Sequence, residues 1–122
     1  SMGRLPLDLK VEDWRLAVGG HVASPLSLSL AELKAMPQAE IVAVNQCSGN
    51  SRGFSEPRVG GGQLAHGAMG NARWTGVPLK AVLSAAGVKP GAVDVVFDGA
   101  DGPVLPTGHE FAKSLAVDHA AD

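Results

Sequence analysis

The chain has 122 residues, the length of one domain, of which 45% are apolar, and its formal charge is −2. The apolar share excludes an intrinsically disordered protein. Sixteen glycines and eight prolines argue against an all-helical bundle, because each interior glycine costs roughly 1 kcal/mol and each proline roughly 3. The absence of a basic run argues against nucleic acid as a partner, and no apolar stretch approaches the ~18 residues that span a membrane.

The first two residues, Ser1-Met2, resemble the remnant of an expression tag. Residues 1–12 are therefore interpreted as a tag remnant and lead-in, and residues 13–122 as one domain. Within that domain, Trp14, Leu16 and Val18 alternate with polar or small residues, which predicts a strand. A capping box from Ser29 to Glu32 then predicts a helix that ends before Pro37.

The remaining elements are expected on both sides of a glycine-rich stretch. The β-branched run Ile41–Val44 predicts a buried strand. Pro78 and Gly87 suit the two ends of a helix that has Leu79, Val82 and Leu83 on one face. Residues 93–97 predict another strand, followed by a turn over 98–103. These elements indicate an α+β fold, with a mixed β-sheet and short helices.

Thirty residues from Cys47 to Gly76 show no convincing periodicity, and eight of them are glycine. Loops longer than about 12–15 residues are uncommon in compact domains and are usually functional or disordered. This segment carries a cysteine, three arginines, His66 and Trp74, which favours a functional loop over a flexible spacer. Arg73 and Trp74 are expected to fix the loop against the core.

Cys47 is the only cysteine, so the chain has no internal disulfide and the thiol is free, a metal ligand or a nucleophile. An inert, buried cysteine is the simplest alternative. The following residues, Ser48-Gly49-Asn50-Ser51-Arg52, favour a reactive one. Backbone N–H groups in a glycine-containing turn can converge on an anion, and the Arg52 guanidinium adds positive charge, so both would stabilise a thiolate.

Several motifs in this order resemble the molybdopterin-binding domain of the sulfite oxidase family, and especially the bacterial sulfite dehydrogenases. They are Trp14-Arg15-Leu16 with Gly20, Pro25–Leu28, Leu33 with Met36-Pro37, Cys47–Arg52, Gly70–Leu79 and Asp98–Gly102. The resemblance implies a sulfite-oxidase-type fold that is incomplete in this chain.

The resemblance also implies a molybdenum cofactor (molybdenum-molybdopterin), in which a pterin dithiolene and one protein thiolate supply the sulfur ligands. Cys47 falls on the position of the metal ligand, and Arg52 on that of a catalytic arginine that binds the oxyanion substrate. Ser48, Gly49, Asn50 and Asp101 fall on positions that contact the cofactor. His66 and His109 have no family counterpart and are expected to be surface histidines or histidines with satisfied hydrogen bonds.

The activity implied for the parent enzyme is oxidation of sulfite to sulfate in the periplasm, with electrons passed to a cytochrome c-type acceptor. Haem would then belong to a partner or another domain. An upstream arginine motif and the downstream half of the family domain are not found in this chain. We therefore expect a fragment that is inactive alone, binds the cofactor weakly and self-associates through exposed edges.

Three alternatives stay open from the sequence. The first is a molybdopterin oxidoreductase with a different small substrate. The second is a cysteine hydrolase that uses Cys47 with His66 or His109. The third is a non-catalytic module whose glycine-rich loop binds a protein partner.

Overall fold

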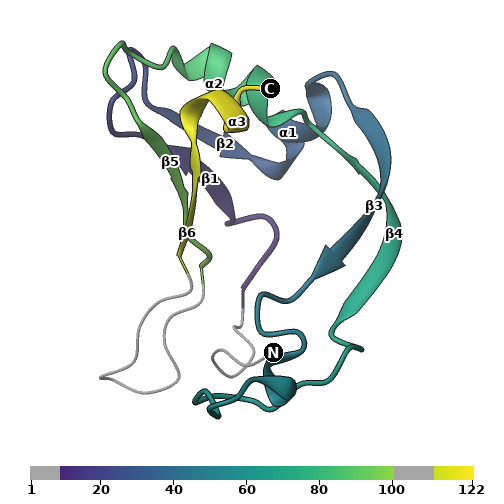
Figure 1. The fold of residues 1–122 in the computed structure, drawn as a ribbon. Coiled ribbons are helices and arrows are strands. Elements are labelled where there is room, and N and C mark those ends of the chain that lie inside the picture. The colour runs from purple at the N-terminus through teal and green to yellow at the C-terminus, as the bar shows by residue number, and fades with distance from the viewer. Residues whose placement is uncertain (1–8, 101–111) are drawn as a thin grey trace. The chain divides into compact units, whose positions relative to one another are not determined.

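The computed structural model describes residues 9–100 and 112–122, which form two compact units (Figure 1). The first unit combines residues 9–38 with the described residues from 77 to 122. The second unit is the continuous segment 39–76.

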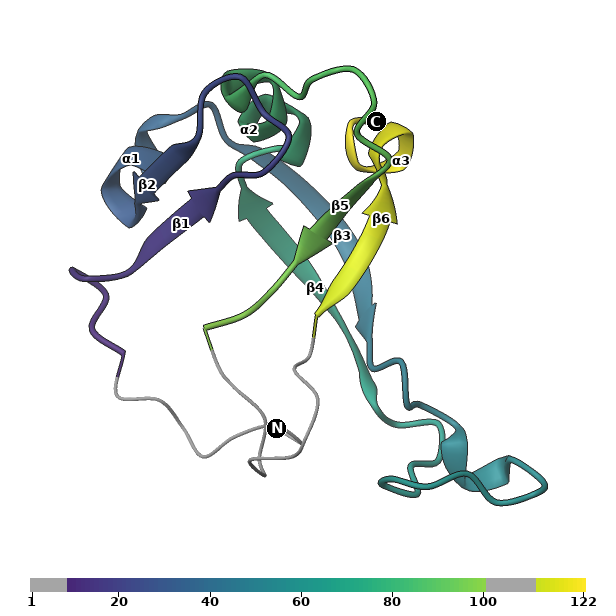
Figure 2. The same cartoon turned by 90° about the vertical axis from the view of Figure 1, so that its left-hand side faces the viewer.

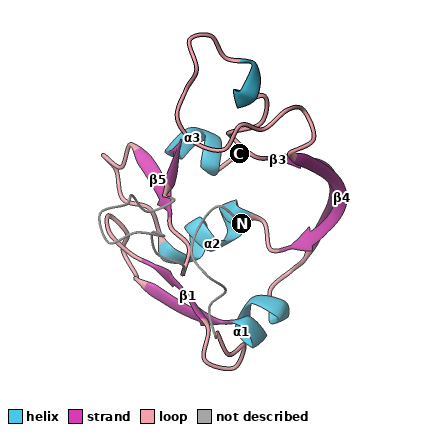
Figure 3. Cartoon of the chain, turned by 90° about the horizontal axis from the view of Figure 1, so that it is seen from below, coloured by secondary structure: helices cyan, strands magenta, loops and turns pink. Residues whose placement is uncertain are grey.

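The first unit contains two antiparallel strand pairs and three short helices (Figure 3). Its elements are β1 (Arg15–Val18), β2 (Leu26–Ser29), α1 (Leu30–Ala35), α2 (Leu79–Ala86), β5 (Asp94–Phe97), β6 (Lys113–Ala116) and α3 (Val117–Ala120). Strand β1 pairs with β2, and β5 pairs with β6. The predicted strands and helices of this unit are therefore confirmed, within a few residues at their ends.

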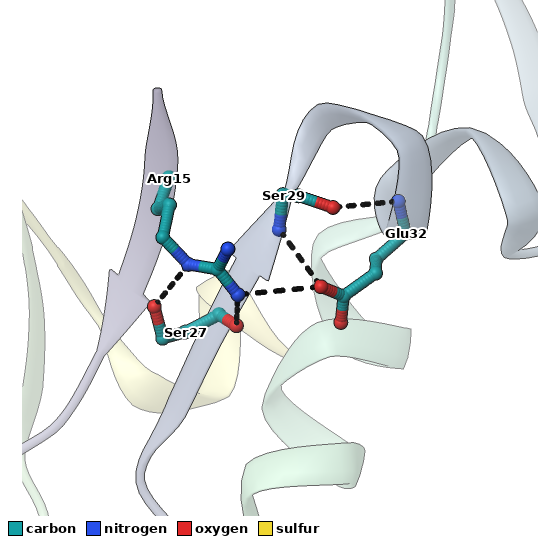
Figure 4. Close-up of polar contacts among 4 residues, drawn as sticks. All are labelled: Arg15, Ser27, Ser29 and Glu32. Carbon is teal, nitrogen blue, oxygen red and sulfur yellow. Dashed lines mark hydrogen bonds and ion pairs between the residues drawn. The ribbon is translucent and has the colours of Figure 1, made fainter. Parts of the chain in front are cut away.

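Arg15 joins the first three elements of this unit (Figure 4). Its guanidinium donates to the hydroxyl and carbonyl of Ser27 on β2, at 2.8 and 2.9 Å, and lies 3.3 Å from a Glu32 carboxylate oxygen in α1. Ser29 and Glu32 form the predicted capping box, because each side chain binds the backbone N–H of the other. The start of α1 is thus defined by side chains that the sequence already specifies.

The core of the first unit gathers around α2. Residues 79, 82, 83 and 86 share one helix face, and Val82, Leu83 and Ala86 are buried. Gly87 ends the helix with a φ of 71°, a left-handed conformation that favours glycine, and its N–H donates to the carbonyl of Leu83. The buried apolar residues in the described part of the chain are Val22, Val82, Leu83, Ala86 and Ala120.

The second unit is a two-stranded antiparallel ribbon that carries a long loop (Figure 2). Strand β3 (Ala39–Gln46) pairs residue by residue with β4 (Met69–Gly76), from Ala39↔Gly76 to Gln46↔Met69. The Trp74 indole N–H donates to the carbonyl of Ala43, and the Arg73 guanidinium lies 3.5 Å from Glu40. In the structure, Arg73 and Trp74 therefore bind the neighbouring strand.

Two sequence predictions about this ribbon are wrong. The strand around Ile41 was expected to be buried, but Ile41, Val42 and Val44 are 58–67% exposed. Residues 69–76 were expected to belong to an irregular loop, but they form β4. Two glycines and several polar residues hide the strand pattern there, and its stability comes from pairing with β3 rather than from local propensity.

The fold class is confirmed as α+β, with short strands and short helices. The strand pairs form three small antiparallel sheets in the part of the chain that the structure describes, rather than one continuous sheet. Among these residues, no helix has both the length and the apolar character needed to cross a bilayer.

We predict that Ser29→Ala lowers the free energy of unfolding of the chain by about 1 kcal/mol, because it leaves an N-terminal amide of α1 without its side-chain acceptor. Urea unfolding followed by circular dichroism measures the change. Ser84→Ala in α2, an exposed position with no capping role, serves as the control and should cause no loss. Equal losses for the two variants would contradict the assigned role of the capping box.

Candidate functional site

Cys47 lies immediately after β3, where the two strands of the ribbon give way to the loop. Its backbone N–H donates to the carbonyl of Ala68 at 2.9 Å, so the strand ladder continues one step into the loop. The thiol is exposed to solvent. The structure therefore does not place Cys47 in the core, as a buried cysteine would require.

The residues after Cys47 fold back on it in a tight turn. The N–H of Gly49 donates to the Cys47 sulfur at 3.3 Å, and the N–H of Asn50 donates to the Cys47 carbonyl at 3.0 Å. A main-chain N–H therefore fixes the position of the sulfur at the start of the turn. The turn expected around Cys47 is thus present in the structure.

Arg52 begins the 3-10 turn η1 (Arg52–Phe54), and its guanidinium is seated between two glycines. A Cβ atom on Gly49 would lie 2.7 Å from one guanidinium nitrogen, and one on Gly61 would lie 2.5 Å from the other. The guanidinium also donates to the carbonyl of Gly62 at 3.3 Å. Gly49 therefore contacts both chemical groups of the site, the Cys47 sulfur through its N–H and the Arg52 guanidinium beside its α-carbon.

The charge of Arg52 is available to an anion as far as the structure describes the chain. The ion pairs within residues 9–100 and 112–122 join Arg15 to Glu32 and Arg73 to Glu40. Arg52 is half-buried. Partial burial strengthens a charge-assisted hydrogen bond relative to one in open water.

The residues expected to contact the cofactor differ in their exposure and contacts. Gly49 is buried, whereas Ser48 is exposed. The side-chain oxygen of Asn50 accepts the N–H of Ala68 at 3.0 Å and so braces the base of the loop. Asp101 lies outside the described residues, and so does His109.

His66 binds neighbouring loop residues. Its Nδ1 atom lies 2.9 Å from the Ser51 hydroxyl, and its ring stacks on Phe54. No histidine in the described segments lies within hydrogen-bonding distance of the Cys47 sulfur, whose partner there is the Gly49 amide. The geometry therefore gives no support to a hydrolase that pairs Cys47 with His66.

The sequence did not predict that the Arg52 guanidinium lies between Gly49 and Gly61, nor the contacts of His66. The three consecutive glycines 60–62 were a visible signal, but the sequence does not show which side chain fills the space they leave. A separate hollow at the tip of the loop is lined by Gly53, Phe54, Ser55, Glu56, Arg58 and Gln63, and does not include Cys47 or Arg52.

The chain is similar in sequence to sulfite oxidases and to a nitrate reductase. The chain is 40% identical over 117 residues to the sulfite oxidase of Gallus gallus, covering 89% of this chain and 26% of that protein. It is 35% identical to the mitochondrial sulfite oxidase of Drosophila melanogaster, covering 91% and 19%, and 30% identical to the NADH nitrate reductase of Petunia hybrida, covering 91% and 13%. The chain thus spans about a quarter or less of the length of these relatives.

A solved structure is similar as well. The sulfane dehydrogenase SoxCD from Paracoccus pantotrophus superposes with a TM-score of 0.76 at 27% identity, covering 95% of this chain and 28% of that one. The family model described as the oxidoreductase molybdopterin binding domain matches residues 2–122. Because this match extends over nearly the whole chain, and the relatives and the solved structure agree with it, the chain belongs to the oxidoreductase molybdopterin-binding domain family.

Proposed function

We propose that the protein containing this chain is a molybdenum-dependent enzyme that oxidises sulfite to sulfate. The observation that carries the proposal is the arrangement around Gly49. On one side its N–H meets the sulfur of the only cysteine, and on the other it leaves room for a guanidinium without a carboxylate partner among the described residues. A soft ligand and an oxyanion-binding group are thereby held on the same turn.

The residues present fit a molybdenum-pterin cofactor. Cys47 offers one exposed cysteine sulfur, and cysteine is the kind of ligand that sulfur-rich transition-metal centres prefer. In this proposal the backbone at Ser48, Gly49 and Asn50 contacts the pterin, and Asp101 is a further cofactor contact. When bound, the cofactor supplies a two-electron oxidation in which sulfite gains an oxygen atom from water, releasing two protons and two electrons.

Arg52 binds the substrate in this proposal. A planar guanidinium can donate two parallel hydrogen bonds to the oxygens of sulfite or sulfate. One of its nitrogens already donates to the Gly62 carbonyl, which fixes the orientation of the plane. Gly49 and Gly61 leave space for the guanidinium, because a Cβ atom on either residue would approach it closely. The chain's own contribution is thus to hold the oxyanion and orient it relative to the thiolate ligand.

The electrons must leave the site one at a time if the acceptor is a haem. We propose a cytochrome c-type acceptor, with haem carried by a partner or another domain, and a periplasmic location for the enzyme. Both follow from the resemblance to bacterial sulfite dehydrogenases. We also propose that the 122-residue chain alone is inactive, because it spans about a quarter or less of the length of the sulfite oxidases it matches.

A second candidate substrate is a sulfane sulfur compound. The similar solved structure is a sulfane dehydrogenase, and it aligns with 95% of this chain. The same two groups on one turn, a cysteine sulfur and a guanidinium, also suit a small sulfur anion other than sulfite. Comparing kcat/KM for sulfite with kcat/KM for thiosulfate and polysulfide in the complete enzyme separates the two candidates.

We predict that Cys47→Ser removes one sulfur neighbour from molybdenum in the complete enzyme and lowers sulfite oxidation by at least about 100-fold, because an alkoxide or hydroxyl is a harder ligand than a thiolate. X-ray absorption at the molybdenum edge counts the sulfur neighbours. Ser48→Ala is the control next to it and should leave that number unchanged. An unchanged sulfur count in Cys47→Ser would disprove the proposed ligand.

We predict that Arg52→Gln raises KM for sulfite by about 10- to 100-fold, the loss expected for charge-assisted hydrogen bonds worth ~1.5–3 kcal/mol. Arg52→Lys keeps the charge but not the planar guanidinium, so its KM for sulfite should lie between those of the wild type and Arg52→Gln. Arg58→Gln is the matched control, since it removes a positive charge from the same loop at an exposed position. Equal effects at positions 52 and 58 would indicate general electrostatic attraction instead of a binding site.

We further predict that the chain alone self-associates through its ribbon. Val42 and Val44 share a face with Met69, according to the strand register, and all three are about half exposed or more. Val42→Lys should shift light scattering towards the monomer at high protein concentration. Ser84→Lys adds the same charge at an exposed position of α2 and should leave the light scattering unchanged. A wild-type chain that stays monomeric at every concentration would refute this prediction.

A further inference from the structure

The turn that carries Arg52 is held by His66 from the opposite side of the loop. The Nδ1 atom of His66 lies 2.9 Å from the hydroxyl of Ser51. The ring of His66 stacks on the ring of Phe54, with 4.6 Å between their centroids and an interplanar angle of 19°. One side chain therefore contacts both the residue before Arg52 and the residue two positions after it.

The backbone reinforces these contacts. The N–H of Ser51 donates to the carbonyl of Ala65 at 2.6 Å, and the N–H of Gly53 donates to the carbonyl of Leu64 at 2.8 Å. Residues 51–54 and 64–66 thus run side by side, linked through main chain and side chains. We call the three side chains of Ser51, Phe54 and His66 the loop clasp.

Ser51 shows why such a clasp is needed. Its φ is 68°, in the left-handed region that L-residues other than glycine rarely adopt. Such conformations persist where surrounding contacts determine them. The hydroxyl bond to His66 and the backbone bond to Ala65 are the contacts that hold Ser51 there.

The Arg52 side chain links this turn to the glycines at positions 61 and 62. The guanidinium donates to the carbonyl of Gly62, and it occupies the space that a Cβ atom on Gly49 or Gly61 would need. A shift of the turn would therefore move the guanidinium out of this seat or press it against the glycine backbone. Holding the turn still also spares the binding step the entropy of ordering a long side chain.

We propose that His66 is a positioning residue for oxyanion binding, acting through Ser51 and Phe54 to hold the Arg52 guanidinium in its seat. The inference rests on the proposed role of Arg52 as the group that binds the substrate. His66 itself does not contact the substrate in this proposal. Its effect is on the affinity for the oxyanion rather than on the oxidation step.

Substitutions can remove the two contacts of His66 separately. His66→Ala removes both the hydrogen bond and the ring. His66→Asn keeps a polar atom near the former Nδ1 position for the Ser51 hydroxyl, whereas His66→Phe keeps the stacked ring. His119→Ala is the control, because it removes an exposed histidine from α3.

In the complete enzyme, His66→Ala should raise KM for sulfite and the inhibition constant of sulfate about tenfold, because it removes both the hydrogen bond to Ser51 and the ring contact with Phe54. The value of kcat should stay within about twofold of wild type, because the clasp acts on binding. His66→Asn and His66→Phe should each recover part of the loss. His119→Ala should change neither constant.

A readout independent of activity uses the ¹⁵N-labelled 122-residue chain. The heteronuclear NOE of the Arg52 backbone amide and of its Nε–H group reports whether the turn and guanidinium are ordered. His66→Ala should lower both values, and Ser51→Ala should lower them as well. Unchanged NOE values in both variants, or a His66→Ala enzyme that matches His119→Ala in KM, would overturn the inference.

The two proposals can fail separately. If Arg52→Gln raises KM but His66→Ala does not, Arg52 binds the oxyanion without the clasp and the inference about His66 is wrong. If Arg52→Gln leaves KM unchanged, the proposed role of Arg52 is wrong, and with it the role of His66 in substrate binding. A lowered NOE in His66→Ala would then show only that the clasp orders the turn.

Discussion

The antiparallel pairing of β3 with β4 is the constraint on which the candidate site depends. It brings residues 46 and 69 opposite each other, so the long connection between them begins and ends at one place. The pairing continues past the strands through Cys47 and Ala68, and again through Ser51 with Ala65. A glycine-rich segment that would otherwise have a large conformational entropy is thereby ordered by its own backbone hydrogen bonds.

The loop carries both a sulfur that can bind a metal and a positive charge that can bind an anion. The proposed soft ligand is a sulfur at the end of a strand, and the group proposed to bind the oxyanion is a guanidinium five residues later. Gly49 lies between them and can contact both because it has no side chain. A main-chain N–H donates to the sulfur, whereas the guanidinium keeps N–H groups that can donate to an anion.

Sequence patterns were most accurate for elements whose ends are fixed by residues close to them in the sequence. The capping box at Ser29 and the left-handed Gly87 at the end of α2 fix helix ends with neighbouring residues, and both are present as expected. Strand β4 was missed because its stability comes from β3, which lies more than twenty residues earlier. The burial expected at Ile41 was also wrong, since a β-branched run indicates a strand but not what covers it.

The same limit applies to the site. Cys47 and Arg52 stood out because a single cysteine and a nearby arginine are chemically distinctive. The contacts of His66 with Ser51 and Phe54 span twelve to fifteen residues and depend on the return path of the loop, which no local pattern encodes. The role of Gly61 likewise becomes visible only once the position of the Arg52 side chain is known.

The glycine seat of Arg52 has an evolutionary consequence. Gly61 has a φ of 112°, so the backbone conformation favours glycine at that position, and a methyl group there would in addition displace the Arg52 guanidinium. The restriction on space at Gly49 exists only while residue 52 has a long side chain in this orientation. Homologues that replace the arginine with a small residue are then free to carry alanine at position 49, so these two positions should covary, whereas position 61 should tolerate substitution only where the loop also changes its path.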